Sequence, residues 1–140
     1  MLILDTDHVS LLERTNAASL SLQMRLGHVG SAEILTSVIT YEEQMRGWLA
    51  HSAQATTTDK MLVSYKRLQR HIELFRFIKV MAFNEAAAKE YELLRRARIR
   101  IGSMDLKIAA VCLANDATLL TRNAKDFRQV PGLKFEDWSL

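Results

Sequence analysis

The sequence has one cysteine and one proline among its 140 residues, and both scarcities limit what the chain can be. With Cys112 alone, no disulfide can form within the chain, and a zinc site built from several cysteines is excluded. Cys112 lies in an apolar stretch, where we interpret it as a small core residue in a reducing, cytoplasmic setting. Pro131 and the five glycines form no linker, so we expect one domain over residues 1–140.

Long apolar runs are also missing. No stretch approaches the ~18 apolar residues that a membrane-spanning helix needs. The N-terminal MLIL is too short for a signal peptide and lacks a basic flank. A Gly-rich phosphate loop and a Ser/His/Asp arrangement for nucleophilic catalysis are absent as well. We therefore expect a soluble protein that has no membrane partner.

Charge of one sign is only slightly in excess. The chain has 19 Lys and Arg residues against 16 Asp and Glu residues, a formal net charge of +3. Hydrophobic residues make up 49% and charged residues 25%, which is the composition of an ordinary globular domain. This mild basicity is compatible with a polyanionic partner but does not identify one.

Short β-leaning runs alternate with helical patterns along the chain. The runs are Leu2–Leu4, Ile34–Ile39, Phe77–Met81, Thr118–Thr121 and, more weakly, Leu133–Phe135. The clearest helical patterns cover Thr58–Phe75, a segment capped by Asn84 that ends at Arg98, and Ser103–Asn115. The alternation predicts an α/β fold with a central parallel sheet of four to five strands flanked by helices on both faces.

Two helical patterns differ in their apolar residues. One carries a stripe on a single face, which we interpret as core or oligomer surface: Met61, Tyr65, Leu68, Ile72 and Phe75. The segment Ser103–Asn115 is apolar nearly all round, which is typical of a buried helix. Trp48 and Trp138 have rings that can stack on bases, although packing is the better explanation for both.

Acidic residues follow the predicted strands. Ligands of a parallel α/β sheet bind beyond the carboxyl ends of its strands, so these acids are candidate binding residues. They are Asp5 and Asp7, Glu42 and Glu43, Asp105 at the start of the buried helix, and Asp126 beside Asn123. Gathered carboxylates repel one another unless a cation neutralises them, and an oxygen-only set suits Mg²⁺ or Mn²⁺. Such an ion supports phosphodiester chemistry through a bound water.

Each acid also has a structural explanation. Asp5 or Asp7 could cap a helix that starts near Thr6. Thr40 and Glu43 match a capping box. Asp105 lies in a first helical turn, which favours a carboxylate whatever its function, and Asp126 could be a solvated turn residue. His8 lies near the first acids, but packing explains it better than metal binding.

Basic residues surround these acids in the sequence. They are Arg95, Arg96, Arg98, Arg100, Lys107, Arg122, Lys125 and Arg128. A guanidinium group binds two phosphate oxygens at once, so the arginines suit a phosphodiester substrate. A solvated helix face explains some of those between Arg95 and Arg98.

Five segments, LDTDH, ITYEEQMRG, IGSMDLKIAA, LLTRNAKDF and VPGLKFEDW, together resemble PIN-domain ribonucleases of the VapC type in order and spacing. The resemblance covers about Leu2 to Trp138. It implies a single PIN-like domain and a Mg²⁺- or Mn²⁺-dependent endoribonuclease that cleaves RNA by metal-activated water. It also implies a homodimeric toxin of a type II toxin-antitoxin pair, held inactive by its cognate antitoxin.

The resemblance also implies roles for individual residues. Asp5, Glu43 and Asp105 match the three acids that bind the metal and carry catalysis. Glu43 is favoured over its neighbour because of its spacing from Thr40 and Gly47. Supporting positions are Thr6, Asp7, Thr121, Asn123 and Asp126. Asn123 stands where many PIN domains carry a fourth acid, so the resemblance does not extend to a tightly bound second metal.

Three other functions remain open from the sequence. A haloacid-dehalogenase-like phosphotransferase also begins with a strand and D-x-D, but its downstream pattern is absent. A PIN nuclease that matures RNA would share every residue of the proposed site. A non-catalytic RNA-binding module would bind without cleavage. The sequence does not indicate which RNA is cut or which class of antitoxin binds.

Overall fold

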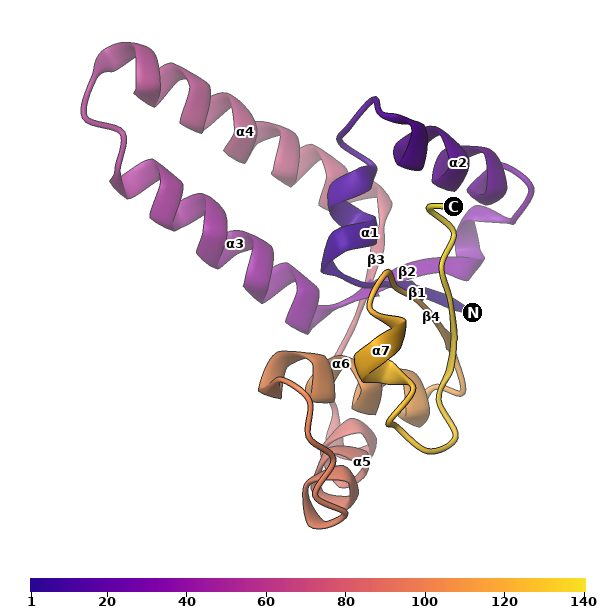
Figure 1. Cartoon of the computed structure of the whole chain (residues 1–140). Helices are drawn as coiled ribbons and strands as arrows, with labels where there is room; N and C mark the ends of the chain where they lie inside the picture. The colour runs from indigo at the N-terminus through magenta and orange to yellow at the C-terminus, as the bar shows by residue number, and fades with distance from the viewer.

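The five predicted strands form one parallel sheet in the computed structural model, which describes all 140 residues (Figure 1). The strands are β1 (Leu2–Leu4), β2 (Ile34–Ser37), β3 (Lys79–Met81), β4 (Thr118–Leu120) and β5 (Lys134–Glu136). Their spatial order is β3-β2-β1-β4-β5, and every neighbouring pair is parallel. The predicted α/β class is confirmed.

Helices cover both faces of this sheet, as predicted. They are α1 (Thr6–Leu11), α2 (Ala17–Leu26), α3 (Val38–Ala53), α4 (Thr58–Phe77), α5 (Glu85–Arg96), α6 (Ser103–Ala114) and the short α7 (Ala124–Phe127), with a 3₁₀ turn at Ser31–Glu33. A larger core cluster forms between the sheet and α5 and α6, and a smaller one between the sheet and α1 and α2. No helix has the length and apolar character needed to cross a membrane.

The helix α3 begins earlier than the sequence predicted. The expected strand Ile34–Ile39 ends at Ser37, whose hydroxyl accepts a hydrogen bond from the Thr40 backbone N–H at 3.1 Å and so caps α3. The capping box at Thr40 and Glu43 is therefore wrong, because both residues lie inside the helix. Glu43 thus has no capping role in α3.

The helix α6 is buried, as its composition predicted. Six of its residues are in the core: Leu106, Ile108, Ala109, Ala110, Val111 and Cys112. Burial raises the pKa of the Cys112 thiol to about 12, so this side chain is an unreactive core group. The helix holds Asp105 in its first turn, at the end of the sheet where β1 and β4 finish.

The helices α3 and α4 lie side by side and project from the sheet as a hairpin, which we call the arm (Figure 1). The predicted stripe on α4 is not core. Met61, Tyr65 and Ile72 are exposed, while Leu68 and Phe75 are half-buried and line an apolar groove between the two helices. The interpretation of the stripe as an oligomer surface therefore remains, and its interpretation as core fails for the exposed residues.

Candidate active site

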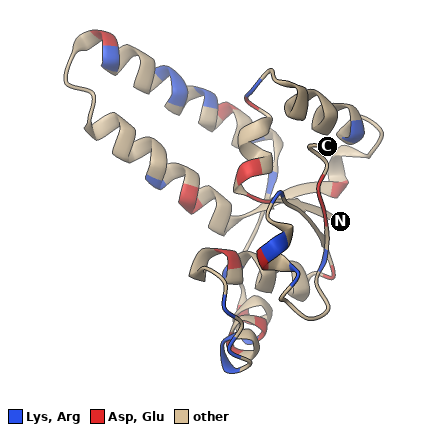
Figure 2. Cartoon of the chain, in the orientation of Figure 1, with Lys and Arg blue, Asp and Glu red and all other residues tan.

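The acids collect at the carboxyl ends of β1 and β4, between the base of the arm and α6 and α7 (Figure 2). The strand order reverses at this point, because the chain runs outward from β1 through β2 to β3 and then returns to β4 on the other side. The Asp5 backbone N–H donates to the Leu120 carbonyl at 3.0 Å, which joins the two strand ends. Open α/β sheets bind ligands at such a switch point.

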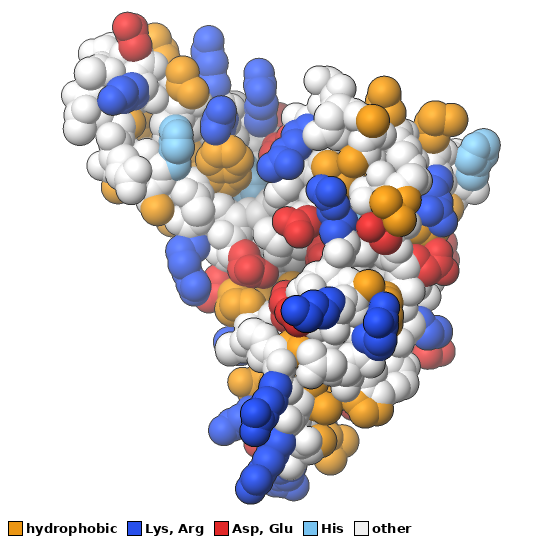
Figure 3. All heavy atoms as spheres, viewed as in Figure 1, with side chains coloured by type: hydrophobic (Ala, Val, Ile, Leu, Met, Phe, Trp, Pro, Cys, Tyr) orange, Lys and Arg blue, Asp and Glu red, His pale blue; other side chains and the backbone are white.

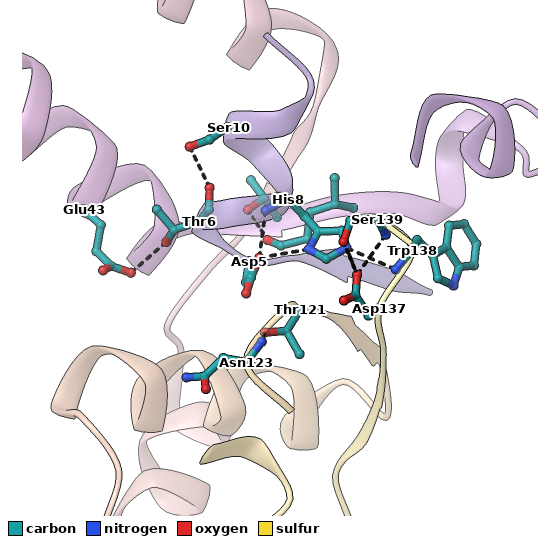
Figure 4. A network of polar contacts seen from close by, with 12 residues as sticks. Asp5, Thr6, His8, Ser10, Glu43, Thr121, Asn123, Asp137, Trp138 and Ser139 are labelled. Carbon is teal, nitrogen blue, oxygen red and sulfur yellow. Dashed lines mark hydrogen bonds and ion pairs between the residues drawn. The ribbon is translucent and has the colours of Figure 1, made fainter. Parts of the chain in front are cut away.

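Asp5 is almost completely buried and caps α1. Its Oδ1 accepts a hydrogen bond from the His8 backbone N–H at 2.9 Å (Figure 4). The capping interpretation is thus confirmed for Asp5, and the cap holds the carboxylate at the end of β1. Asp7 is exposed in the first turn of α1, and its side chain makes no hydrogen bond to the other acids.

His8 lies behind Asp5 and is fully buried. Its Nε2 accepts a hydrogen bond from the Trp138 backbone N–H at 3.3 Å, so in this arrangement the ring proton is on Nδ1. Nδ1 is 3.3 Å from Asp5 Oδ1, a close contact without good hydrogen-bond geometry. His8 therefore packs the chain's last residues against Asp5, and its predicted packing role is confirmed. Nothing in the sequence indicated the contact with Trp138, which lies 130 residues away.

Glu43 faces Asp5 from the second turn of α3 and is half-buried. The Thr6 hydroxyl donates to Glu43 Oε1 at 2.8 Å, which fixes the carboxylate (Figure 4). Glu42, in contrast, is exposed and pairs with Arg46 at 2.9 Å. Of the two adjacent acids, Glu43 is the one that the fold directs toward the cluster.

Asn123 connects the acids on the other side of the cluster. Its Nδ2 donates to Asp126 Oδ2 at 2.9 Å and to Asp105 Oδ2 at 3.3 Å. The buried Thr121 hydroxyl accepts from the Asn123 backbone N–H at 3.0 Å and fixes the turn that presents this amide. Asn123 thus contributes no charge of its own, and it brings Asp126 beside Asp105.

The electrostatics of Asp105 show that these carboxylates lie close enough to repel. The pKa of Asp105 is raised to about 6, chiefly by burial and then by the neighbouring charges of Glu43, Asp5 and Asp126. The hydrogen bond from Asn123 acts in the opposite direction. No Lys or Arg forms an ion pair with any of these four acids. The cluster therefore carries negative charge that the protein does not neutralise.

The cluster fits a divalent metal ion by chemistry and by charge. All its donors are oxygen atoms, which Mg²⁺ and Mn²⁺ prefer, and a cation would relieve the repulsion at Asp105. In this structure no group of three Asp, Glu, His or Cys side chains is close enough together to hold one ion. The hydrogen bonds from Thr6 and Asn123 hold the carboxylates in their present positions, so binding would require side-chain rotation.

The predicted basic residues lie around α6 and α7 without touching the acids. Most are exposed, and Arg95 pairs with Glu92 at 3.1 Å. The sequence reasoning missed a second basic group: Arg14, Arg67 and Arg70 converge beside the acids in a pocket between α1, α3 and α4. Arg67 and Arg70 lie one turn apart on α4, but Arg14 is distant from them in the sequence, so only the packing of the arm against α1 brings the three together.

Comparisons with known proteins agree with this geometry. The family model of the PIN domain matches residues 2–133. Ribonuclease VapC1 of Haemophilus influenzae strain R2866 is 31% identical over 111 residues, which is 76% of this chain and 75% of that protein. The structure of VapBC-1 from nontypeable Haemophilus influenzae has the same fold, with a TM-score of 0.76 at 23% identity over 99% of this chain and 98% of that chain. FitAcB from Neisseria gonorrhoeae has a TM-score of 0.72 at 25% identity, with complete coverage of both chains. The chain belongs to the PIN-domain family and, within it, to the VapC ribonucleases.

Proposed function

We propose that this protein is an endoribonuclease that requires Mg²⁺ or Mn²⁺ and holds the ion with Asp5, Glu43 and Asp105. The observation that supports this most directly is the gathering of these carboxylates at one edge of the sheet with no Lys or Arg paired to them, an arrangement in which the pKa of Asp105 is raised to about 6. Carboxylates kept together at this cost need a cation partner. Among PIN-domain ribonucleases, an all-oxygen site at the end of the sheet suits phosphodiester hydrolysis.

Each proposed ligand is fixed by a different local device. The N-terminus of α1 holds Asp5, the Thr6 hydroxyl holds Glu43, and the Asn123 amide holds Asp105. When bound, the metal supplies an acidified water and a polarised phosphoryl oxygen. The chain gathers the three carboxylates at one edge of the sheet, and the partial burial of the site limits competing bulk water. The protein thus contributes a local concentration of oxygen ligands, whose side chains rotate onto the ion when it binds.

The test is cleavage of a fluorescently labelled single-stranded RNA by the purified protein. We expect products with Mg²⁺ or Mn²⁺, none in EDTA, and full recovery when excess Mg²⁺ is restored. Cleavage that persists in EDTA would reject the metal mechanism.

Asp5→Asn and Asp7→Asn make a matched pair for this test. Asn caps a helix about as well as Asp, so neither change should unfold α1. We expect Asp5→Asn to abolish cleavage and Asp7→Asn to retain it, because only Asp5 is buried at the cluster. Equal activity of the two variants would remove Asp5 from the site.

We further propose that the protein is a cytoplasmic toxin restrained by an antitoxin. One structure of the same fold is described as a toxin-antitoxin complex from Klebsiella pneumoniae. An unneutralised acid cluster is a natural target for a basic side chain of an inhibitor, which would replace the cation. Adding the cognate antitoxin should suppress cleavage, and unchanged activity would contradict this mechanism. A small antitoxin-like gene beside this one would favour a toxin over an RNA-maturation nuclease.

The two remaining alternatives give different results. A haloacid-dehalogenase-like phosphotransferase would form an aspartyl-phosphate at Asp5, which mass spectrometry of the trapped protein would detect. A non-catalytic module would bind RNA and leave it intact with every metal. The phosphotransferase's downstream pattern is absent from the sequence, and a non-catalytic module gives no reason for Asp105, Glu43 and Asp126 to be gathered without a cationic partner.

A further inference from the structure

A polar pocket lies next to the acid cluster, in the hollow between the arm and α1 (Figure 3). Its volume is about 580 Å³, which is room for a nucleotide. Figure 3 shows Lys and Arg side chains along the α4 side of this hollow and acidic side chains at its inner end. Nine of its ten lining residues are polar or glycine, so it differs from the apolar groove on the arm.

Trp48 is the one hydrophobic residue that lines the pocket. It is half-buried, and the Arg67 guanidinium lies over its ring, 5.4 Å from the ring centroid. The packing interpretation of Trp48 is therefore incomplete, because the residue also forms part of the pocket wall. Nucleic-acid bases stack on aromatic rings and on guanidinium planes, and this pair offers both.

The charge of the pocket suits a phosphate. Arg14, Arg67 and Arg70 line it, and none of the three forms an ion pair with a carboxylate. Arg76, on the same helix as two of them, is instead paired with Glu73 at 3.2 Å. Unpaired guanidinium groups that converge in a hollow are available for phosphate oxygens.

Glu13 is the single carboxylate in the pocket. Partial desolvation in the hollow raises the pKa of this exposed residue, while the charges of Arg70 and Arg67 lower it. One carboxylate does not cancel three guanidinium groups, and a carboxylate can accept a hydrogen bond from the exocyclic amino group of a base. The pocket thus combines a stacking surface, phosphate-binding groups and an acceptor for a base edge.

The pocket is continuous with the acid cluster. Thr6 lines the pocket, and its hydroxyl donates to Glu43 at 2.8 Å. The buried Gln44 forms the wall between α1 and α3, because its Nε2 donates to the Thr6 carbonyl and to the Ser10 hydroxyl. A strand of RNA that has a phosphodiester at the acids therefore meets this pocket with a neighbouring nucleotide.

We propose that the pocket binds the nucleotide next beyond the two that the scissile bond joins, with its base on the Trp48–Arg67 pair and its phosphate at Arg14 and Arg70. The inference rests on the proposed ribonuclease function and adds a substrate subsite to it. An acidic peptide is the alternative occupant. RNA is favoured because the only apolar lining is one flat ring, already stacked with a guanidinium group.

The variants that test this are Trp48→Leu and the double variant Arg67→Gln with Arg70→Gln. Trp48→Phe keeps an aromatic ring, and Lys60→Gln with Lys66→Gln removes the same charge from exposed positions on α4 that do not line the pocket. The first measurement is the affinity for a fluorescein-labelled 12-nucleotide single-stranded RNA in EDTA, at several salt concentrations. The second is kcat and KM in Mg²⁺, for that RNA and for a dinucleotide.

We expect Trp48→Leu to weaken RNA binding about 10-fold, with substantial recovery in Trp48→Phe. The double arginine variant should lower the slope of log affinity against log salt by about 0.7, the contribution of the one phosphate contact of Arg70, whereas the lysine control should change it little. Both pocket variants should raise KM for the long RNA and leave its kcat and the dinucleotide kinetics nearly unchanged. A dinucleotide positioned at the acids cannot reach the pocket with a further nucleotide.

Pocket variants that bind and cut RNA like the lysine control would overturn the proposal. Lost affinity for the cognate antitoxin with unchanged RNA binding would assign the pocket to that protein and also overturn it. These results differ from failure of the proposed function, in which the wild-type protein cuts no RNA with any metal. The binding measurement in EDTA tests the pocket even in that case.

Discussion

The acid cluster buries charge, whereas the arm exposes apolar side chains, so the two regions depart from ordinary burial in opposite directions. Asp5 is only 6% exposed, and the carboxyl of Asp105 is held at a raised pKa. On the arm, Tyr65 and Ile72 are 62% and 56% exposed. Such departures are typical of binding sites, and we propose a cation at the acids and another protein surface on the arm.

The largest effect that we expect at the cluster comes from Asp105→Asn. Cleavage should fall by more than about 100-fold, since even residues that only support metal ligands cost about 10- to 100-fold. Folding should survive, because the change forfeits a charge–dipole term of only about 0.3–1 kcal/mol and removes repulsion from Glu43 and Asp5. RNA cleavage and thermal unfolding with and without Mg²⁺ measure the two effects. A folded variant that binds Mg²⁺ and cuts RNA at the wild-type rate would make Asp105 a helix-start residue.

The two adjacent acids on α3, Glu43 and Glu42, should respond very differently to loss of their charge. Glu43→Gln should reduce cleavage by about 10- to 100-fold or more, because this carboxylate faces the cluster under the Thr6 hydroxyl. Glu42→Gln should have an effect below about 2-fold, since it loses only an exposed ion pair with Arg46. Steady-state cleavage of the same RNA measures both. Equal losses would mean that charge near α3 matters and the direction of the side chain does not.

The exposed apolar side chains of the arm predict a homodimer. We expect each protomer to stay folded when dimerisation is lost. We expect Tyr65→Glu or Ile72→Glu to raise the dimer dissociation constant at least about 10-fold, because each places a charge in an apolar interface. Leu93→Glu is the control, since Leu93 is similarly exposed on α5, away from the arm. Analytical sedimentation at micromolar concentration is the measurement. A wild-type protein that sediments only as a 16.0 kDa species would refute the dimer.

The smallest effect that we expect concerns His71, the buried titratable group of the arm. Neither ring nitrogen has a hydrogen-bond partner, and the ring packs against Tyr41 and Phe75. Burial lowers its pKa below the ordinary 6.5, so between the two values the unfolded chain binds more protons than the folded one. His71 therefore contributes stability above pH 6.5 that is lost as the pH falls through the lowered pKa.

Melting temperature against pH measures this effect. We expect His71→Phe to flatten the acid side of the curve, while a change of the exposed His28 to Gln should leave it as in wild type. If the melting temperatures of wild type and His71→Phe fell equally as the pH was lowered, protonation of this buried ring would not govern the stability of the arm.

Several features of the site could be predicted because they depend on local pattern. Asp5 follows an apolar strand and precedes a helix, so its place at the sheet edge and its capping role are both visible in the sequence. The helix from Ser103 is apolar on every side, and burial follows from that composition. The start of α3 was missed because Val38 and Ile39 suit a strand as well as a helix, and Ser37 decides between them by capping.

Other features depend on residues that are distant in the sequence. Examples are the contact of His8 with Trp138, the hydrogen bond from Asn123 to Asp105, and the convergence of Arg14 with Arg67. Each of these contacts depends on how distant helices and strands pack against one another. Residue periodicity predicts the elements but not their relative orientation.

The sequence by itself determined the alternation of strands and helices, the parallel sheet and the acids at its carboxyl edge, because hydrophobic periodicity and strand ends are local properties. The tertiary structure decided which acids meet. It directs Glu43 inward and leaves Glu42 and Asp7 in solvent, and it places Asp126 beside Asp105. It also forms the pocket between the arm and α1. Side-chain direction and the packing of distant helices settle these points, and both exist only once the chain has folded.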